Sequence, residues 1–238
     1  MSPRDSHEET EHGSQFKPAV KNIIKLTLAF AEAVGKNQAD KSENLIVSPY
    51  NAVACLGMVA KGADHDTRKE MAQTLFGTDG AGLDAAASAY NALNAEILKA
   101  NKGQVEITTA NSVWTNKDII TLRQSFADDL KATFGAEISG EDFSAADTVT
   151  KLNNWADINT HGLIKEIIKQ LNPDDAMVLA SSLYIKAPWT HKFDKALTED
   201  KGFIADGAGA SFTPTMHQDF KEGLSYLKGK DFEAVSLT

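Results

Sequence analysis

Hydrophobic residues recur at helical spacing near the start of the chain. The apolar positions fall three or four residues apart within residues 18–34, and Gly35 follows them. This spacing places the apolar side chains on one side of a helix, and a glycine commonly follows a helix end. The pattern predicts an amphipathic first helix over residues 18–34, with its inner side formed by Ile23, Ile24, Thr27, Phe30, Ala31 and Val34.

Residues 44–77 carry the most informative pattern in the chain. A short apolar segment leads into Ser48 and Pro49, almost every residue from Ala52 to Ala60 is apolar, and Gly62 follows the run. Ser48 can cap a helix, and Pro49 suits the first helical position, where its missing N–H would have no helical partner. A helix that is apolar on every side has no solvent face and must be buried. We therefore expect a strand followed by a buried helix that ends at Gly62.

Three more helices follow from the same kinds of signal. Thr67 and Glu70 have the spacing of a capping box, and Gly77 lies at the expected helix end. An alanine-rich stretch over residues 83–99 predicts another helix. Apolar residues then recur every four positions and end at Gly135, which predicts a further amphipathic helix with an inner side formed by Leu122, Phe126, Leu130 and Phe134.

Strand patterns separate these helices from the rest of the chain. Residues 104–114 alternate between apolar and polar positions, as a strand does. Residues 177–185 (MVLASSLYI) are apolar on both alternating faces and follow the turn at Asn172-Pro173, which predicts a central strand covered above and below. Residues 203–216 contain the turn Asp206-Gly207-Ala208-Gly209 and predict a hairpin.

One more helix is expected between the first strand and the central strand. Asp147 or Thr148 can cap it, and it ends near Thr160 to Gly162. Its inner side is formed by Val149, Leu152, Trp155 and Ala156. Because no repeat and no linker is present, we predict a single α+β domain over residues 16–238, preceded by a disordered polar tail over residues 1–15.

Composition narrows the class of protein. The 238 residues are 42% hydrophobic and 24% charged, which is typical of a soluble globular domain, and the formal net charge of −9 argues against nucleic-acid binding. No run of 18 apolar residues is present, so we expect no membrane contact. The acidic start of the chain is unlike a signal peptide, so the localisation stays open.

Residues with the chemistry of an active site are few. Cys55 is the single cysteine, allows no intramolecular disulfide, and is interpreted as a small apolar residue of the buried helix. The six histidines show no HExxH spacing, and neither GxSxG nor GxxxxGK occurs. Residues 64–66 (Asp-His-Asp) have side chains that can bind a metal, but acidic residues also stabilise helix starts, and we interpret these residues in that way. Large aromatic residues at periodic positions are usually core, as we expect for Trp114, Trp155 and Trp189. We predict no enzyme and no catalytic, cofactor-binding or metal-binding residue.

Several separated segments resemble the serpins, in the same order as in that family. They are the Ser48-Pro49 motif with its following helix and Gly62-Ala63 loop, NSVW at 111–114, LNNWADINTHGLI at 152–164, LASSLYIKAPW at 179–189, and the pair PTMHQ at 214–218 and AVSL at 234–237. Each segment alone is a weak signal, but their collinear order extends over nearly the whole chain. The chain therefore resembles a serpin.

The resemblance implies a fold and an activity. The fold would be an incomplete serpin fold, α+β, with an N-terminal helical region packed on a large mixed sheet A and parts of sheets B and C. The activity would be suicide inhibition of a serine or cysteine protease, in which the cleaved reactive loop inserts into sheet A as a new strand. A non-inhibitory serpin that acts as a binding, carrier or chaperone protein is the alternative. The family is most often extracellular and has cytoplasmic members.

The resemblance also implies functional positions. Ser48, Asn51 and Ser181 correspond to the shutter beneath the opening sheet, and Trp189 corresponds to the breach at the sheet end. The F-helix motif is carried by Trp155, Thr160 and Gly162. Asn51 stands where the family usually has Ser, and Ser181 where it usually has Asn. Either the two residue types have exchanged places within one buried hydrogen-bond set, or the alignment is loose at these positions.

Insertion of a loop into the sheet requires segments of a serpin that are not among these 238 residues. Serpins continue through a hinge, a reactive loop and further strands, whereas the sequence given reaches residue 238 in the β region after the hairpin. We therefore expect an N-terminal portion of a serpin that does not inhibit a protease alone. We also expect self-association through an open sheet edge, because unpaired strand edges recruit other strands.

Overall fold

In the computed structural model, the chain forms two compact units. The units are Met1–Ile185 and Lys186–Thr238, and each is described here by itself. The predicted tail over residues 1–15 lies outside the described residues, and a single domain over residues 16–238 stays a prediction. The structure describes residues 17–38, 45–100, 105–189, 191–204, 209–219, 224–230 and 232–236.

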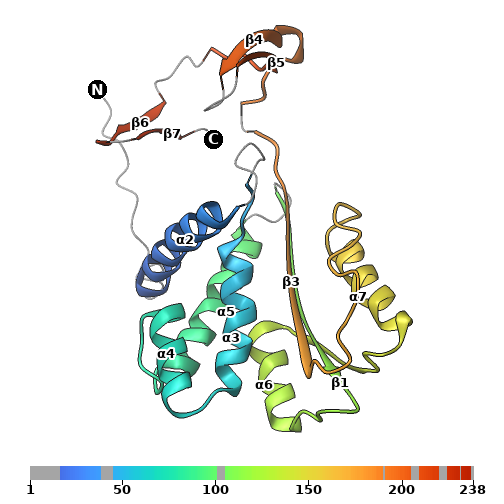
Figure 1. Ribbon diagram of the computed structural model, residues 1–238. Coiled ribbons are helices and arrows are strands. Elements are labelled where there is room, and N and C mark those ends of the chain that lie inside the picture. The colour runs from blue at the N-terminus through green and yellow to red at the C-terminus, as the bar shows by residue number, and fades with distance from the viewer. Residues whose placement is uncertain are drawn as a thin grey trace. The chain divides into compact units, whose positions relative to one another are not determined.

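Among the described residues, five helices of the first unit come before helix α7 (Ala146–Asn159) in the chain (Figure 1). They are α2 (Lys17–Asn37), α3 (Pro49–Gly62), α4 (His65–Phe76), α5 (Leu83–Ala100) and α6 (Gln124–Phe134). With α7, the six predicted helices are present in the predicted order. Gly77 and Gly135 end α4 and α6 in the left-handed conformation, with φ of 70° and 61°, as expected of glycine after a helix.

Helix α3 packs against each of the helices α2, α4, α5 and α6, and these five helices are called the helical cluster. Its N-cap is Ser48, whose side chain accepts a hydrogen bond from the Asn51 N–H, as predicted. Val53 and Met58 are fully buried. The expectation of a helix without a solvent face is wrong for two positions, because Leu56 and Val59 are 46% and 41% exposed on the side of the helix away from the core.

The start of α4 differs from the expected capping box. Asp64, not Thr67, is the N-cap, and its Oδ1 accepts a hydrogen bond from the His65 N–H at 2.8 Å. The Arg68 N–H already donates to the Asp64 carbonyl oxygen at 3.2 Å, so Thr67 lies inside the first turn. A carboxylate next to the positive end of the helix dipole stabilises this earlier start.

Three strands form the sheet of the first unit. They are β1 (Glu106–Asn116), β2 (Glu137–Glu141) and β3 (Met177–Lys186), in the order β2-β1-β3. Strands β1 and β2 are parallel. The Asn116 N–H donates to the Ala176 carbonyl oxygen at 2.9 Å, which brings the end of β1 beside the start of β3. The predicted strand at 177–185 is confirmed, but within the described sheet it is an edge strand.

Both faces of the sheet are covered, as expected for β3. Met177 and Leu179 pack against the helical cluster, whereas Val178 and Ala180 pack against a second cluster that includes Trp155. Alternate side chains of a strand point to opposite faces, so this division follows from the pleat. Helix α7 (Ala146–Asn159) supplies the second cover, and Figure 1 shows the sheet between α7 and the other helices.

The start of α7 also differs from the prediction, whereas its end agrees with it. The N-cap is Ala145, which makes no side-chain cap bond. Thr148 is instead inside the first turn, where its Oγ1 donates to the Asp142 carbonyl oxygen at 2.6 Å. The helix ends at Asn159, and Thr160 is its C-cap.

The second unit consists of two hairpins with antiparallel strands. Strand β4 (Glu199–Ile204) pairs with β5 (Ala210–Thr215), and β6 (Ser225–Lys228) pairs with β7 (Glu233–Ser236). The hairpin predicted over residues 203–216 is confirmed, while most of its predicted turn lies outside the described residues. A short 3-10 helix, η1 (Lys195–Leu197), precedes β4.

Candidate functional site: the contact between helix α3 and strand β3

A polar contact joins the first turn of α3 to the middle of β3. The Asn51 Nδ2 donates to the Ser181 carbonyl oxygen at 3.0 Å. The Ser48 Oγ donates to the Asn51 Oδ1 at 3.0 Å and accepts from the Asn51 N–H at 3.4 Å. The three residues predicted as a shutter therefore lie together. The bonds to Ser48 hold the Asn51 side chain with its amide directed at the strand.

The acceptor on β3 is a main-chain atom. Ser181 contributes its carbonyl oxygen to this bond, not its hydroxyl. The exchange of Asn and Ser predicted a hydrogen bond from the Asn51 amide, and this bond is present. The Ser181 side chain takes no part in it. A bond to the main chain tolerates any side chain at the acceptor position, so the contact depends on Asn51 far more than on Ser181.

Replacing Asn51 by alanine is expected to lower the free energy of unfolding by about 1–2 kcal/mol, because the Ser181 carbonyl oxygen loses its partner. Ser181→Ala keeps that bond and serves as the matched control, with a loss below about 0.5 kcal/mol. Urea unfolding followed by circular dichroism measures both. The two losses should add in the double variant, and a coupling energy above about 1 kcal/mol would show that the Ser181 side chain participates after all.

Helix α5 holds the first turn of α3 from another side. The Tyr90 Oη donates to the Tyr50 carbonyl oxygen at 2.9 Å, and the two rings stack at 5.0 Å. Burial raises the pKa of Tyr90 well above its ordinary value, so its hydroxyl stays a donor. The turn that presents Asn51 to the strand is therefore rigidly placed.

The F-helix residues lie at the end of α7 and in the turn that follows. Trp155 is 7% exposed in the second cluster. The Thr160 Oγ1 donates to the Ala156 carbonyl oxygen at 2.7 Å and accepts from the Ile164 N–H at 2.9 Å. Gly162 has φ of 83° and its N–H donates to the Asp157 carbonyl oxygen at 2.8 Å. These residues close the helix and turn the chain back along it, which explains their types: glycine adopts this φ without strain.

Two asparagines that the sequence reasoning missed hold the connection between α7 and β3. The Asn153 Oδ1 accepts from the N–H groups of Ile167 and Ile168 at 2.9 and 3.1 Å, and its Nδ2 donates to the Ile168 carbonyl oxygen at 2.8 Å. The Asn116 Nδ2 donates to the Pro173 carbonyl oxygen at 2.8 Å. Asparagine is a poor residue inside helices and strands, so its presence in α7 and β1 was an available signal.

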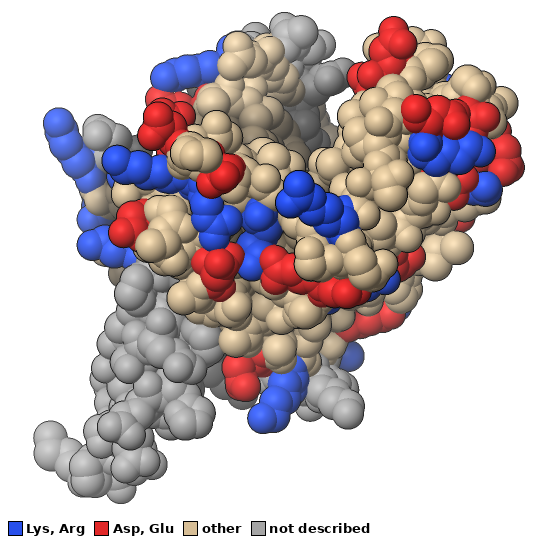
Figure 2. Space-filling model, turned by 90° about the horizontal axis from the view of Figure 1, so that it is seen from below, with Lys and Arg blue, Asp and Glu red and all other residues tan. Residues whose placement is uncertain are grey.

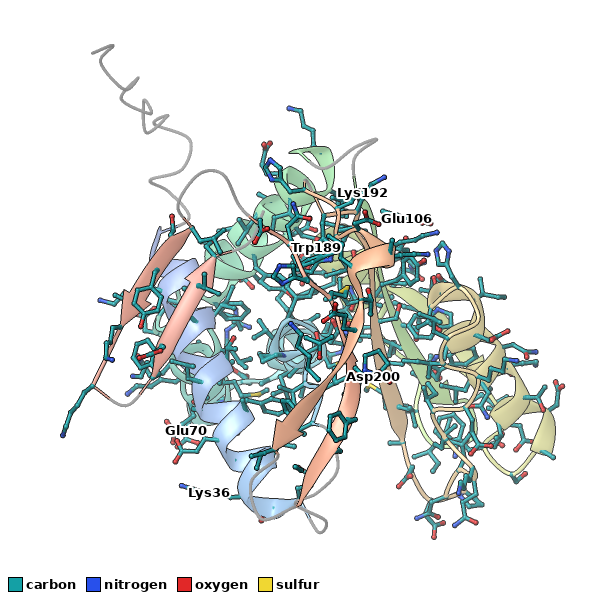
Figure 3. The ribbon with its side chains drawn as sticks, turned by 90° about the horizontal axis from the view of Figure 1, so that it is seen from above. Lys36, Glu70, Glu106, Trp189, Lys192 and Asp200 are labelled. Carbon is teal, nitrogen blue, oxygen red and sulfur yellow. The ribbon has the colours of Figure 1, made fainter. Side chains whose placement is uncertain are left out.

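Trp189, the predicted breach residue, belongs to the second unit. It follows β3, is 46% exposed, and contacts Phe193 edge-to-face with ring centroids 5.9 Å apart. Figure 3 labels Trp189 among the side chains drawn. Its role at the breach stays a prediction, as do the functional roles of the shutter and F-helix residues.

Buried charge in the helical cluster is structural. The side chain of Lys61 is 7% exposed, and its Nζ lies 2.7 Å from the Asp84 Oδ1 and 2.8 Å from the Asp129 Oδ2. Burial lowers the pKa of Lys61, but its hydrogen bonds to Asp129 and Asp84 raise it by more, so the net direction is upward. The paired ammonium therefore stays charged and links α3 to α5 and α6.

The described residues offer little chemistry of other kinds. Burial raises the pKa of the Cys55 thiol to about 11, which disfavours the reactive thiolate. Within the described ranges, no group of three His, Cys, Asp or Glu side chains is placed to hold a metal ion. None of the described helices is both long and apolar enough to cross a bilayer. On the face shown in Figure 2, acidic and basic side chains are interspersed.

The comparisons with known proteins agree with this geometry. The family model described as Serpin (serine protease inhibitor) matches residues 22–238, so the chain belongs to the serpins. Its fold is an incomplete serpin fold, with helices, the mixed sheet A and parts of the smaller sheets. The description of the family refers to inhibition of serine proteases.

The match to each relative covers nearly all of this chain but only about half of the relative's own length. Serpin-Z3 of Arabidopsis thaliana is 27% identical over 234 residues, which are 92% of this chain and 57% of that protein. The structure of Arabidopsis AtSerpin1 in its native stressed conformation is similar with a TM-score of 0.77 and 23% identity, over 92% of this chain and 55% of that one. The structure of human thyroxine-binding globulin complexed with thyroxine is similar with a TM-score of 0.78 and 24% identity, over 93% of this chain and 59% of that one.

Proposed function

We propose that this chain supplies the sheet-opening part of a serpin that inhibits serine or cysteine proteases by loop insertion. In this proposal, the target protease is the partner and β3 is the strand beside which the cleaved loop inserts. The contact between Asn51 and Ser181 acts as a shutter, because it ties the strand to a helix of the immobile core. The activity belongs to the complete protein, and the chain spans about half the length of its relatives.

One observation carries the proposal. Strand β3 lies at the edge of the described sheet, and the Asn51 side chain from α3 binds the main chain of β3 at Ser181. The bond uses a main-chain carbonyl oxygen and none of the side chains of β3, so it does not depend on which side chains the strand carries. This arrangement is suited to a sheet that accepts a new strand.

A chimera tests the proposal. The 238 residues are joined to the part of Serpin-Z3 that follows its matched region and are incubated with trypsin, subtilisin and papain. A band that survives detergent and heat on a denaturing gel is expected for the chimera with at least one protease, and none for the 238-residue chain alone. A protease whose catalytic nucleophile is replaced by alanine is the control. A folded chimera that is only cleaved, with no trapped protease, would contradict loop insertion.

The non-inhibitory alternative and the predicted self-association keep the status of predictions. Thyroxine-binding globulin shares the fold and binds a small molecule, so the fold alone does not separate an inhibitor from a carrier. The composition of the hinge separates them, because small residues permit insertion and bulky or charged residues hinder it. Self-association through the edge of β3 follows from its unpaired side within the described sheet.

A further inference from the structure

A histidine at the end of α7 contacts both long strands of the sheet. The ring of His161 stacks on the ring of Tyr184 from β3, with centroids 4.1 Å apart and planes at 6°. Its Nδ1 lies 3.4 Å from the Glu106 Oε1, at the start of β1. Figure 3 labels Glu106. The three groups come from three separate parts of the chain, and none of them is among the residues predicted for the shutter, the breach or the F-helix.

The backbone at His161 is held in an unusual conformation. Its φ is 54°, in the left-handed region that non-glycine residues rarely adopt, although histidine is among those that do so more often. The turn is closed on both sides, because the His161 N–H donates to the Ile158 carbonyl oxygen at 3.3 Å and Gly162 bonds to Asp157. These bonds hold the backbone of the turn, and the ring is 41% exposed while it stacks on Tyr184.

We propose that His161 is a pH-sensitive latch that fastens the connection between α7 and β3 to the sheet. Two groups of the sheet contact the ring, namely the Glu106 carboxylate from β1 and the aromatic ring of Tyr184 from β3. An imidazolium attracts a carboxylate and the face of an aromatic ring, whereas the neutral ring keeps only the stacking. Histidine changes charge between about pH 5 and 8, so the latch is tighter at the acidic end of this range.

Backbone amides in the connection between α7 and β3 allow the state of the latch to be measured. The N–H groups of Ile164, Ile167 and Ile168 are bonded to the side chains of Thr160 and Asn153, neither of which titrates in this range. Hydrogen exchange at these amides therefore follows the opening of the connection and needs no protease. The latch goes beyond the proposed inhibitory function, and a failed chimera leaves it intact.

The experiment is hydrogen exchange with mass spectrometry on the 238-residue chain at about pH 5.5 and about pH 8, corrected for the intrinsic pH dependence of exchange. Protection over residues 164–168 is expected to be about fivefold higher at the lower pH. His161→Gln should bring the ratio to about one. Glu106→Gln keeps the stacking and should reduce the ratio to about twofold.

His65→Gln is the matched control. His65 also has a left-handed backbone, with φ of 50°, and a carboxylate oxygen of Asp64 lies 3.3 Å from its Nδ1. It lies at the start of α4 and should leave the ratio over residues 164–168 unchanged. Equal protection at both pH values in the unmodified chain would overturn the latch. A fivefold ratio that survives in Glu106→Gln and in any folded His161→Gln would overturn it too.

Discussion

Replacing Trp155 by alanine is expected to lower the free energy of unfolding by about 3–5 kcal/mol, the largest loss predicted for this chain. The indole is 7% exposed and belongs to the cluster between α7 and the sheet. Truncation leaves a cavity that the short helix cannot close, because its ends are fixed by Thr160 on one side and by the Thr148 bond to Asp142 on the other. Urea unfolding followed by far-ultraviolet circular dichroism measures the loss.

Two control variants separate packing from other contributions of Trp155. Its Nε1 is buried and has no hydrogen-bond partner among the described residues, so Trp155→Phe loses volume but no bond and should cost less than about 1.5 kcal/mol. Ile158 lies on the same helix and is 73% exposed. Ile158→Ala should therefore change the free energy of unfolding by less than about 0.5 kcal/mol. If Trp155→Phe cost as much as Trp155→Ala, packing would not be the cause.

Replacing Gly57 by valine is expected to lower the free energy of unfolding by about 2–3 kcal/mol. A Cβ atom at Gly57 would lie 2.9 Å from the Phe134 Cζ and 3.5 Å from the Phe76 Cζ. Both rings are buried in the helical cluster, so the added atoms must push α3 away from α6. The helix propensity gained by removing a glycine is about 1 kcal/mol and offsets only part of this strain.

Gly35 provides the control for Gly57. It lies within α2, and among the described residues a Cβ there would meet the Leu45 Cδ2 at 3.6 Å, an ordinary van der Waals distance. Gly35→Ala should therefore be neutral or should stabilise the chain by up to about 1 kcal/mol. Thermal and urea unfolding of both variants decide the matter. A Gly57→Val variant as stable as the unmodified chain would mean that α3 and α6 are not in close contact.

Local sequence signals predicted the elements well and their starts less well. The ends of α4 and α6 were predicted because Gly77 and Gly135 adopt a left-handed conformation at little cost. The starts of α4 and α7 were misplaced, because several polar residues near each start could act as caps. Which of them is used depends on where the preceding loop is held, and that is a tertiary property.

The sequence by itself determined the order of helices and strands, the Ser48 cap and the residue types of the α7 motif, because each rests on interactions within a few neighbouring residues. The tertiary structure alone decided that Asn51 bonds the main chain of Ser181, 130 residues away, and that His161 meets Glu106 and Tyr184. Those contacts depend on how α3 and α7 pack on opposite faces of one sheet. Periodicity identifies the face that each helix buries, but the atoms that meet across the sheet are set by strand register and by the turns between elements.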